Sequence, residues 1–409
     1  VLYGDGPKND RDFRYAGAME QLHAKYPADT DAAAFYALSL LGTAHNGRDE
    51  RIYMRAAAIL LPLFYKSPPH PGVAHYLIHS CDDPIHAPLA LPAALAYSKI
   101  APGAAHAQHM TSHIFLALGM WDDLVRANER ATAIVNRERA AEGAAPSRCG
   151  HYNYWLEYGY LEQGRYQEAK QVVAGCRAEA EERGMAAKAR GTVDPDNSSL
   201  GSFVQMRSRY LTDTGEWDGD VSRWTVETGD AVMPHFNDVF GAGFAAARRG
   251  DLAAARESLA TLETIMPRLA ALFDQSGMTP DDPERGVPAI ERDQLEAVIL
   301  LAEGHGDQAI TLAQDAATAE ENLPYAFGPP YPPKPSFELL GEVLLREHRA
   351  KESRQALQRA LLLTPNRSQT LLDLLHASRE LGDQGTVNSA LTELRKNWHG
   401  ADHPPPAER

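Results

Sequence analysis

Residues 164–169 read Gly164-Arg165-Tyr166-Gln167-Glu168-Ala169, a sequence typical of a tight turn between two packed helices. Glycine suits the end of the first helix because it adopts the left-handed conformation without a steric penalty. The aromatic residue can then pack back between the helices, and the small alanine lets the second helix approach closely. Comparable turns recur along the chain at Gly47-Arg48, Gly119-Met120-Trp121, Gly215-Glu216-Trp217, Gly250-Asp251-Leu252, Gly306-Asp307 and Gly382-Asp383. The sequence therefore predicts a repeated helix–turn–helix unit.

The composition agrees with a helical array. The chain has 409 residues, which is too long for one compact core and indicates several domains or an elongated array. Alanine is abundant whereas valine and isoleucine are sparse, which favours helix over strand. The net charge of −15 argues against a nucleic-acid or anionic-lipid partner. No apolar run is long enough to span a membrane.

The cysteines and the first residue leave the compartment open. Cys81, Cys149 and Cys176 form no Cys-x-x-Cys motif, so a thiolate zinc knuckle is not expected. A Cys149–Cys176 disulfide is compatible with the spacing but is not predicted by it. The chain begins with Val1 rather than Met, and an N-terminal targeting signal would lie outside it. A periplasmic or secreted location and a cytoplasmic one are both consistent with these residues.

The glycine turns resemble the central signature of the tetratricopeptide (TPR) repeat, most clearly at Leu118-Gly119 with Trp121 and at residues 164–169. Pro102 and Pro365 lie where TPR repeats end, and the resemblance covers most of residues 30–397. More specifically, a bacterial family of TPR-repeat proteins with paired His-x-x-x-His motifs and no characterised function is similar at residues 70–79, 106–115, 328–335, 338–342 and 365–367. The resemblance implies an all-α, TPR-like α-solenoid, a right-handed superhelix of antiparallel helix pairs, but no reaction.

The helix pattern divides the chain into five parts. Residues 1–185 are expected to form an N-terminal TPR-like array, and residues 186–323 degenerate middle repeats that begin with a loop at 186–200. Residues 324–335 contain six prolines and are expected to form a rigid, extended connector. Residues 336–397 should form a C-terminal TPR pair, and residues 398–409 a polar, proline-rich tail that frays.

Two His-x-x-x-His motifs lie in the same repeat register. His75 and His79 precede His109 and His113 by 34 residues, which is the TPR period. Residues four apart share one helix face, so each motif can chelate a metal ion. Equivalent helices of neighbouring repeats lie side by side, with the helix at about 84–100 behind them. The spacing therefore predicts that the two histidine pairs face each other in a concave groove.

Other histidines extend this cluster. His106 lies three residues before His109 and continues its stripe, and His70 precedes the first motif. The predicted ligands are His75, His79, His109 and His113, then His106 and His70, for one or two ions. Imidazole nitrogens suit copper, zinc or iron. A second arrangement places one ion on His70, His75 and His79 and another on His106, His109 and His113.

Further residues could support the metal or line the groove. Asp82 and Asp83 follow His79 closely and could act as a ligand, a base, or an acceptor that orients a histidine. His86 lies in the same region, and His151 opens the next inner helix. Tyr154 and Tyr158 correspond to His109 and His113 by a 45-residue offset and could wall the groove.

Two functions compete at this stage. The first is a metalloprotein that holds its ion in the groove, with redox chemistry on a small substrate as the reaction considered; no residue is assigned a catalytic role. The second is a non-catalytic scaffold that binds a peptide or partner protein, in which the histidines are structural. No His-Glu-x-x-His, Gly-x-Ser-x-Gly or phosphate-loop motif occurs. The sequence thus favours a transition metal as the only cofactor.

Overall fold

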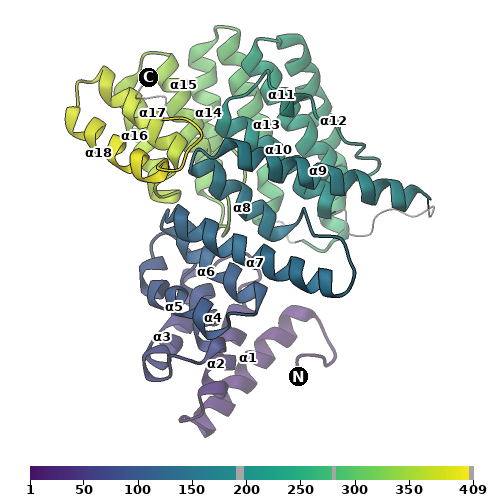
Figure 1. Ribbon diagram of the computed structural model, residues 1–409, viewed down its shortest axis with the longest axis vertical. Helices are drawn as coiled ribbons and strands as arrows, with labels where there is room; N and C mark the ends of the chain where they lie inside the picture. The colour runs from purple at the N-terminus through teal and green to yellow at the C-terminus, as the bar shows by residue number, and fades with distance from the viewer. Residues whose placement is uncertain (190–197, 279–281, 405–409) are drawn as a thin grey trace. The chain divides into compact units, whose positions relative to one another are not determined.

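The computed structural model describes residues 1–189, 198–278 and 282–404, and this part of the chain is helical throughout, with no β-strand (Figure 1). Most successive helices pack against each other. The predicted all-α, TPR-like array of helix pairs is therefore confirmed. The chain divides into two compact units, which we describe separately: unit 1 comprises Val1–Glu138 and Pro324–Gly328, and unit 2 comprises Arg139–Leu323 and Pro329–Arg409.

Unit 1 is built from the first helices of the chain. They are α1 (Lys8–Lys25), α2 (Thr30–Leu41), α3 (Glu50–Lys66), α4 (Pro71–Ser80), α5 (Ala87–Ile100), α6 (Ala105–Ala117) and most of α7 (Trp121–Ala141). Helix α5 packs against both α4 and α6, which also contact each other directly. The expected contact of the helix near 84–100 with both neighbouring helices is thus confirmed, and α4 and α6 are the helices that carry the two histidine motifs.

Unit 2 contains the remaining helices. They are α8 (His151–Glu162), α9 (Tyr166–Ala189), α10 (Ser198–Thr214), the short 3₁₀ helix η1 (Val221–Arg223), α11 (Val232–Arg249), α12 (Leu252–Gln275), α13 (Pro283–Ala302), α14 (Gly306–Glu321), α15 (Ser336–Arg346), α16 (Ala350–Leu363), α17 (Ser368–Glu380) and α18 (Gln384–Asn397). Of the loop predicted at 186–200, residues 186–189 belong to α9 and 198–200 to α10, while 190–197 lie outside the described residues.

The glycine turns adopt the predicted backbone conformation, with one correction. Gly119 and Gly164 have φ of 64° and 65°, in the left-handed region that favours glycine. Before α14, however, Gly304 rather than Gly306 has the positive φ, 82°. Gly306 is the first residue of α14, where a Cβ atom would lie only 2.1 Å from Glu347 Oε2. Glu347 is exposed and its side chain could move aside, so neither turn geometry nor packing requires a glycine here.

Part of the proline-rich segment is buried and so is not a solvent-exposed linker, and residues 328–329 and 331–334 form bends. Residues 332–335 are buried within unit 2. The side chain of Gln294 donates hydrogen bonds to the Lys334 carbonyl (2.7 Å) and to Ser336 Oγ (2.8 Å). A chain outside helices and sheets lacks regular partners for its backbone groups, and Gln294 supplies one for the Lys334 carbonyl. Residues 332–335 therefore lead into α15 as a buried, hydrogen-bonded stretch of chain.

The end of the chain is better anchored than its composition indicates. Trp398 is buried, and the backbone N–H of Asp402 donates to the Gly164 carbonyl (3.1 Å). The Asp402 carboxylate accepts a hydrogen bond from the Gln167 amide (2.7 Å) at the start of α9. The expectation that the tail frays after Trp398 is therefore wrong as far as Asp402; residues 405–409 lie outside the described residues.

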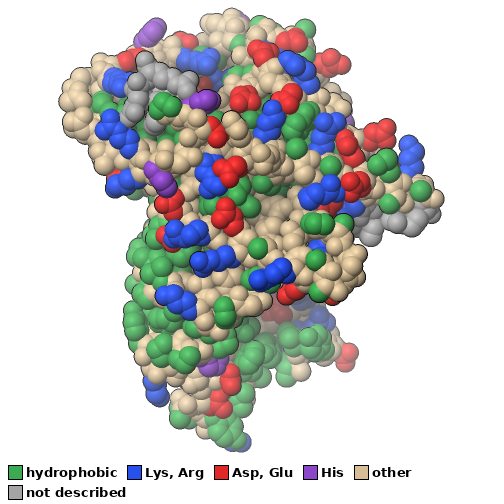
Figure 2. All heavy atoms as spheres, viewed as in Figure 1, with side chains coloured by type: hydrophobic (Ala, Val, Ile, Leu, Met, Phe, Trp, Pro, Cys, Tyr) green, Lys and Arg blue, Asp and Glu red, His purple; other side chains and the backbone are tan. Residues whose placement is uncertain are grey.

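Three further features bear on the open points of the sequence. Cys149 and Cys176 form a disulfide in unit 2, and Cys81 is free and buried in unit 1. Hydrophobic side chains gather on the visible face over α3 and α5 (Figure 2), where Tyr65, Leu89 and Leu95 are exposed. Within the described ranges, no helix is both long enough and apolar enough to cross a membrane.

Candidate metal centre

Two neighbouring helices of unit 1 bring five imidazoles together. Helix α4 contributes His75 and His79, and α6 contributes His106, His109 and His113. The i, i+4 spacing within each helix places these side chains on one face, as expected. His109 and His113 are buried, His75 and His79 are half-buried, and His106 is exposed. The cluster therefore runs from the protein surface into the interior.

The five rings form a closed circuit. From His79 to His75 the ring centroids are 4.8 Å apart, and from His75 to His106 they are 5.0 Å apart. The circuit continues from His106 to His109 at 6.5 Å and from His109 to His113 at 5.0 Å. It closes from His113 back to His79 at 6.0 Å. Each imidazole thus neighbours two others, as predicted for motifs in repeat register.

Two pairs of nitrogens lie at the separation expected for ligands of one metal ion. In the inner pair, His109 Nε2 and His113 Nε2 are 3.2 Å apart; in the outer pair, His75 Nε2 and His106 Nε2 are also 3.2 Å apart. Two nitrogens on one tetrahedral zinc ion lie about 3.3 Å apart. Within unit 1, His79 adjoins both pairs and is the candidate for a third ligand.

The inner pair is oriented from behind by two polar side chains. His113 Nδ1 lies 2.6 Å from Asp82 Oδ2, and His109 Nδ1 lies 2.7 Å from Asn128 Oδ1 of α7. Asn128 Nδ2 donates to the Leu124 carbonyl (3.0 Å), which identifies its oxygen as the acceptor for His109. His109 therefore holds its proton at Nδ1, and its Nε2 lone pair points towards His113. Asp82 was predicted as an orienting residue, whereas no sequence signal identified Asn128.

Burial keeps the half-buried histidines neutral. Desolvation, with a further contribution from neighbouring imidazoles, lowers the pKa of His75 to about 3 and that of His79 to about 4. Burial raises the pKa of Asp82 to about 7, although His79 and Arg48 oppose this shift. Neutral imidazole is the form that binds metal ions, so α4 presents ligands that are ready to coordinate at neutral pH.

Other predicted residues of unit 1 have structural contacts instead. His70 caps α4: its Nδ1 accepts a hydrogen bond from the Val73 amide (3.2 Å), and its Nε2 lies 3.0 Å from Asp31 Oδ1. Asp83 binds Arg48 and also accepts from His86 Nδ1 (2.8 Å). These contacts hold His70, Asp83 and His86 away from the circuit of five rings.

The remaining predicted groove residues belong to unit 2. His151 is exposed at the start of α8. Tyr154 accepts a hydrogen bond from the buried guanidinium of Arg209 (2.6 Å), and the Tyr158 ring lies 5.8 Å from the guanidinium carbon of Arg367. Both tyrosines therefore pack against buried arginines of their own unit.

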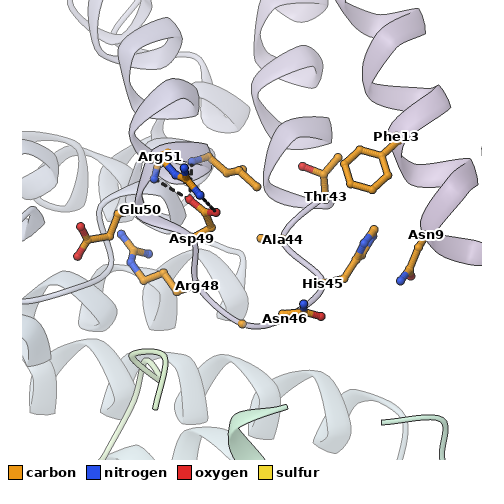
Figure 3. Close-up of a pocket in the computed structure, with 12 residues that line it drawn as sticks. Asn9, Phe13, Thr43, Ala44, His45, Asn46, Arg48, Asp49, Glu50 and Arg51 are labelled. Carbon is orange, nitrogen blue, oxygen red and sulfur yellow. Dashed lines mark hydrogen bonds and ion pairs between the residues drawn. The ribbon is translucent and has the colours of Figure 1, made fainter. Parts of the chain in front are cut away.

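A separate pocket of about 660 Å³ lies at the turn between α2 and α3 (Figure 3). Phe13 of α1 and residues 43–52 line it, and none of the five clustered histidines does. Two of its titratable groups have partners: His45 lies 3.0 Å from the Asp12 carboxylate, and Asp49 caps the first turn of α3. The concentration of ligand-type side chains is at α4 and α6, not at this pocket.

Comparisons with known proteins add little to this geometry. No protein-family model matches the chain, and no curated protein sequence matches it. Similar solved structures include yeast Tom70 (12% identity, 97% of this chain and 93% of that one, TM-score 0.30). A chain of the APC/C hetero-tetramer Cut9–Hcn1 is 11% identical over 95% of this chain and 91% of that one, with a TM-score of 0.28. The P58(IPK) TPR domain is 11% identical over 90% and 92%, with a TM-score of 0.24. Likenesses this weak say nothing about what this chain binds or does.

The histidine pKa values predict that metal-free unit 1 loses stability on acidification. A histidine with a lowered folded-state pKa stabilises the protein above its unfolded pKa of about 6.5, and this stability is lost as pH falls towards the folded value. His75 and His79 both lower the stability on acidification in this way. Asp82 is a single group with a raised pKa, and its effect on the stability has the opposite sign. The protection of the α4 and α6 amides against hydrogen exchange, relative to their intrinsic rates and in the presence of a chelator, should therefore fall from pH 7 to pH 4.5. An unchanged exchange pattern after correction for intrinsic rates would contradict this prediction.

Proposed function

We propose that unit 1 binds a transition-metal ion between α4 and α6, and that the other helices form the scaffold that holds these two in register. The inner pair carries the proposal, because two buried Nε2 atoms 3.2 Å apart are each backed by a polar acceptor at Nδ1. Metal-bound histidines are commonly oriented in this way by a carboxylate or carbonyl behind the ring. The donor set of imidazoles without thiolate suits zinc, copper or iron.

The protonation state of Asp82 decides whether the inner pair is arranged for a metal ion or for a hydrogen bond between its two rings. If Asp82 is ionised, His113 holds its proton at Nδ1 and both Nε2 lone pairs face each other, an arrangement that a cation between them would stabilise. If Asp82 is protonated, a hydrogen-bond chain can run from Asp82 through His113 to His109 without any metal. If a metal ion replaced this series of hydrogen bonds, a proton would be released, as is usual when ligands must be deprotonated before they bind.

Metal titration of the purified chain tests the proposal. After removal of bound ions with a chelator, calorimetric titrations with Zn²⁺, Co²⁺ and Cu²⁺ should show saturable binding of at least one of them, at micromolar affinity or tighter. Repeating the titration in buffers of different ionisation enthalpy should reveal the release of about one proton near pH 7. If none of these ions shows saturable binding, the metal proposal is wrong.

Replacing Asp82 with asparagine should weaken metal binding without removing a ligand. Asparagine can still accept a hydrogen bond from His113 Nδ1 but supplies no negative charge to balance the ion. Substitution of such an orienting group typically costs about 10–100-fold in metal affinity. The matched control is His70→Asn, because asparagine is itself a good helix cap and His70 has capping contacts. Equal metal affinity of the Asp82→Asn variant and the unmodified chain would show that Asp82 does not support the site.

A scaffold that binds a peptide or partner protein is the second candidate function. The exposed apolar side chains on α3 and α5, including Tyr65, Leu89 and Leu95, favour it because soluble monomers rarely leave such side chains grouped at the surface (Figure 2). In that case the chain of contacts from Asn128 through His109 and His113 to Asp82 would be structural. A histidine cluster that binds no metal would support this function.

A further inference from the structure

A short segment from far along the sequence packs onto the inner histidine pair. Pro324–Gly328 belongs to unit 1, although most of that unit ends at Glu138. The Phe327 ring lies 5.8 Å from the His113 ring, at an interplanar angle of 45°. Phe327 therefore covers an imidazole that is itself 97% buried, with a relative exposure of 3%. The other side of Phe327 faces solvent, since 50% of its surface is exposed.

A second aromatic residue of the segment lies near Asp82 and Asp83. Burial raises the pKa of Tyr325, and the negative charges of Asp82 and Asp83 raise it further, which places its hydroxyl within electrostatic reach of both. Asp82 is the residue that orients His113. The segment thus adjoins the inner pair at the His113 ring and at the group behind it.

The backbone of the segment is suited to a fixed position. Prolines flank it at Pro324 and Pro329, and proline fixes φ and so lowers the entropy lost on ordering. Gly328 has φ of 119°, a conformation that favours glycine and lets the chain turn away directly after Phe327. Local geometry therefore helps to hold Phe327 against His113.

The two nitrogen pairs differ in their access to solvent. His106 of the outer pair is exposed, whereas both members of the inner pair are buried. We propose that Phe327 closes the inner pair to solvent, so that metal ions enter and leave through the outer pair of His75 and His106. This inference rests on the proposed metal-binding function. Phe327 then controls the rate at which metal ions exchange and does not coordinate them.

The rate of metal loss to an excess of chelator tests this inference. In the Phe327→Ala variant the loss of Co²⁺ or Zn²⁺ should accelerate by about an order of magnitude, because water and chelator can then reach the inner pair directly. The number of ions bound should stay the same, and Phe327→Leu, which keeps an apolar cover, should give an intermediate rate. The matched control is Phe13→Ala, since Phe13 is 58% exposed in the same unit and contacts His45 rather than the cluster.

The outcomes separate the inference from the function on which it rests. If the unmodified chain binds no metal ion, the proposed function fails and the inference fails with it. If it binds metal but Phe327→Ala releases the ion at the unmodified rate, only the closure by Phe327 is wrong. A Phe327→Ala variant that no longer binds metal would also overturn the inference, because Phe327 would then be needed for the site itself.

Discussion

Replacing Arg367 with methionine is expected to lower the free energy of unfolding of unit 2 by about 3–5 kcal/mol, the usual cost of removing one partner from a buried ion pair. Arg367 is fully buried at the start of α17. Its Nε donates to Glu338 Oε2 of α15 (2.8 Å), and its Nη1 donates to Glu162 Oε1 of α8 (2.9 Å). Its Nη2 binds Asp213 of α10. One guanidinium thus joins helices from three distant parts of the sequence.

The cost of this substitution should depend on pH. Burial would raise the pKa of Glu338, but Arg367 and Lys334 override it and hold the pKa at about 2. For Glu162 burial dominates, and its pKa is raised to about 7 despite Arg367. Without the arginine these carboxyl groups would take up protons in the folded state. The stability lost in Arg367→Met should therefore be smaller at about pH 5.5 than at about pH 8.

Urea denaturation followed by circular dichroism, at both pH values, measures this effect. The control is Arg359→Met, because Arg359 pairs with Glu321 while 46% of its side chain is exposed. A surface ion pair of this kind contributes about 0–1 kcal/mol. Arg367→Met and Arg359→Met variants of equal stability would show that the buried network does not hold the C-terminal helices to α8 and α10.

The second large effect concerns the proposed metal ligands. His79→Ala and His113→Ala should each weaken metal binding by more than about 100-fold, because removing a ligand costs more than removing the group that orients it. His113 belongs to the inner pair, and His79 lies beside both His75 and His113. Helicity should be unchanged, since the stability of a repeat array is distributed over many contacts between neighbours.

Equilibrium titration of both variants, with helicity checked by circular dichroism, measures this prediction. The His70→Asn variant again serves as the control and should bind metal normally. It also separates the two arrangements derived from the sequence, because a site of His70, His75 and His79 would lose its ion in this variant. Full metal occupancy in His79→Ala and His113→Ala would exclude the cluster as the binding site. Unfolding of α4–α6 in both variants, without metal binding by the unmodified chain, would make the histidines structural.

Part of the candidate centre was predictable because it depends on local geometry. The i, i+4 spacing places His75 with His79 and His109 with His113 on single helix faces, and the 34-residue offset places the two faces in neighbouring repeats. Asp82 was also within reach because it follows His79 closely. His70 is not one of the five clustered rings: its side chain accepts a hydrogen bond from the Val73 amide at the start of α4, a contact that a spacing argument does not weigh.

The sequence by itself determined the helices, their pairing and the register of the histidines, because periodicity, glycine turns and repeat length act over a few dozen residues. Tertiary structure alone decided which distant groups complete each site. Asn128 behind His109, Phe327 over His113, and Arg367 among its three carboxylates come from segments without a fixed sequence offset to their partners. Such contacts form when the chain brings together residues that are far apart in the sequence, and no local pattern of residues encodes which distant segments will meet.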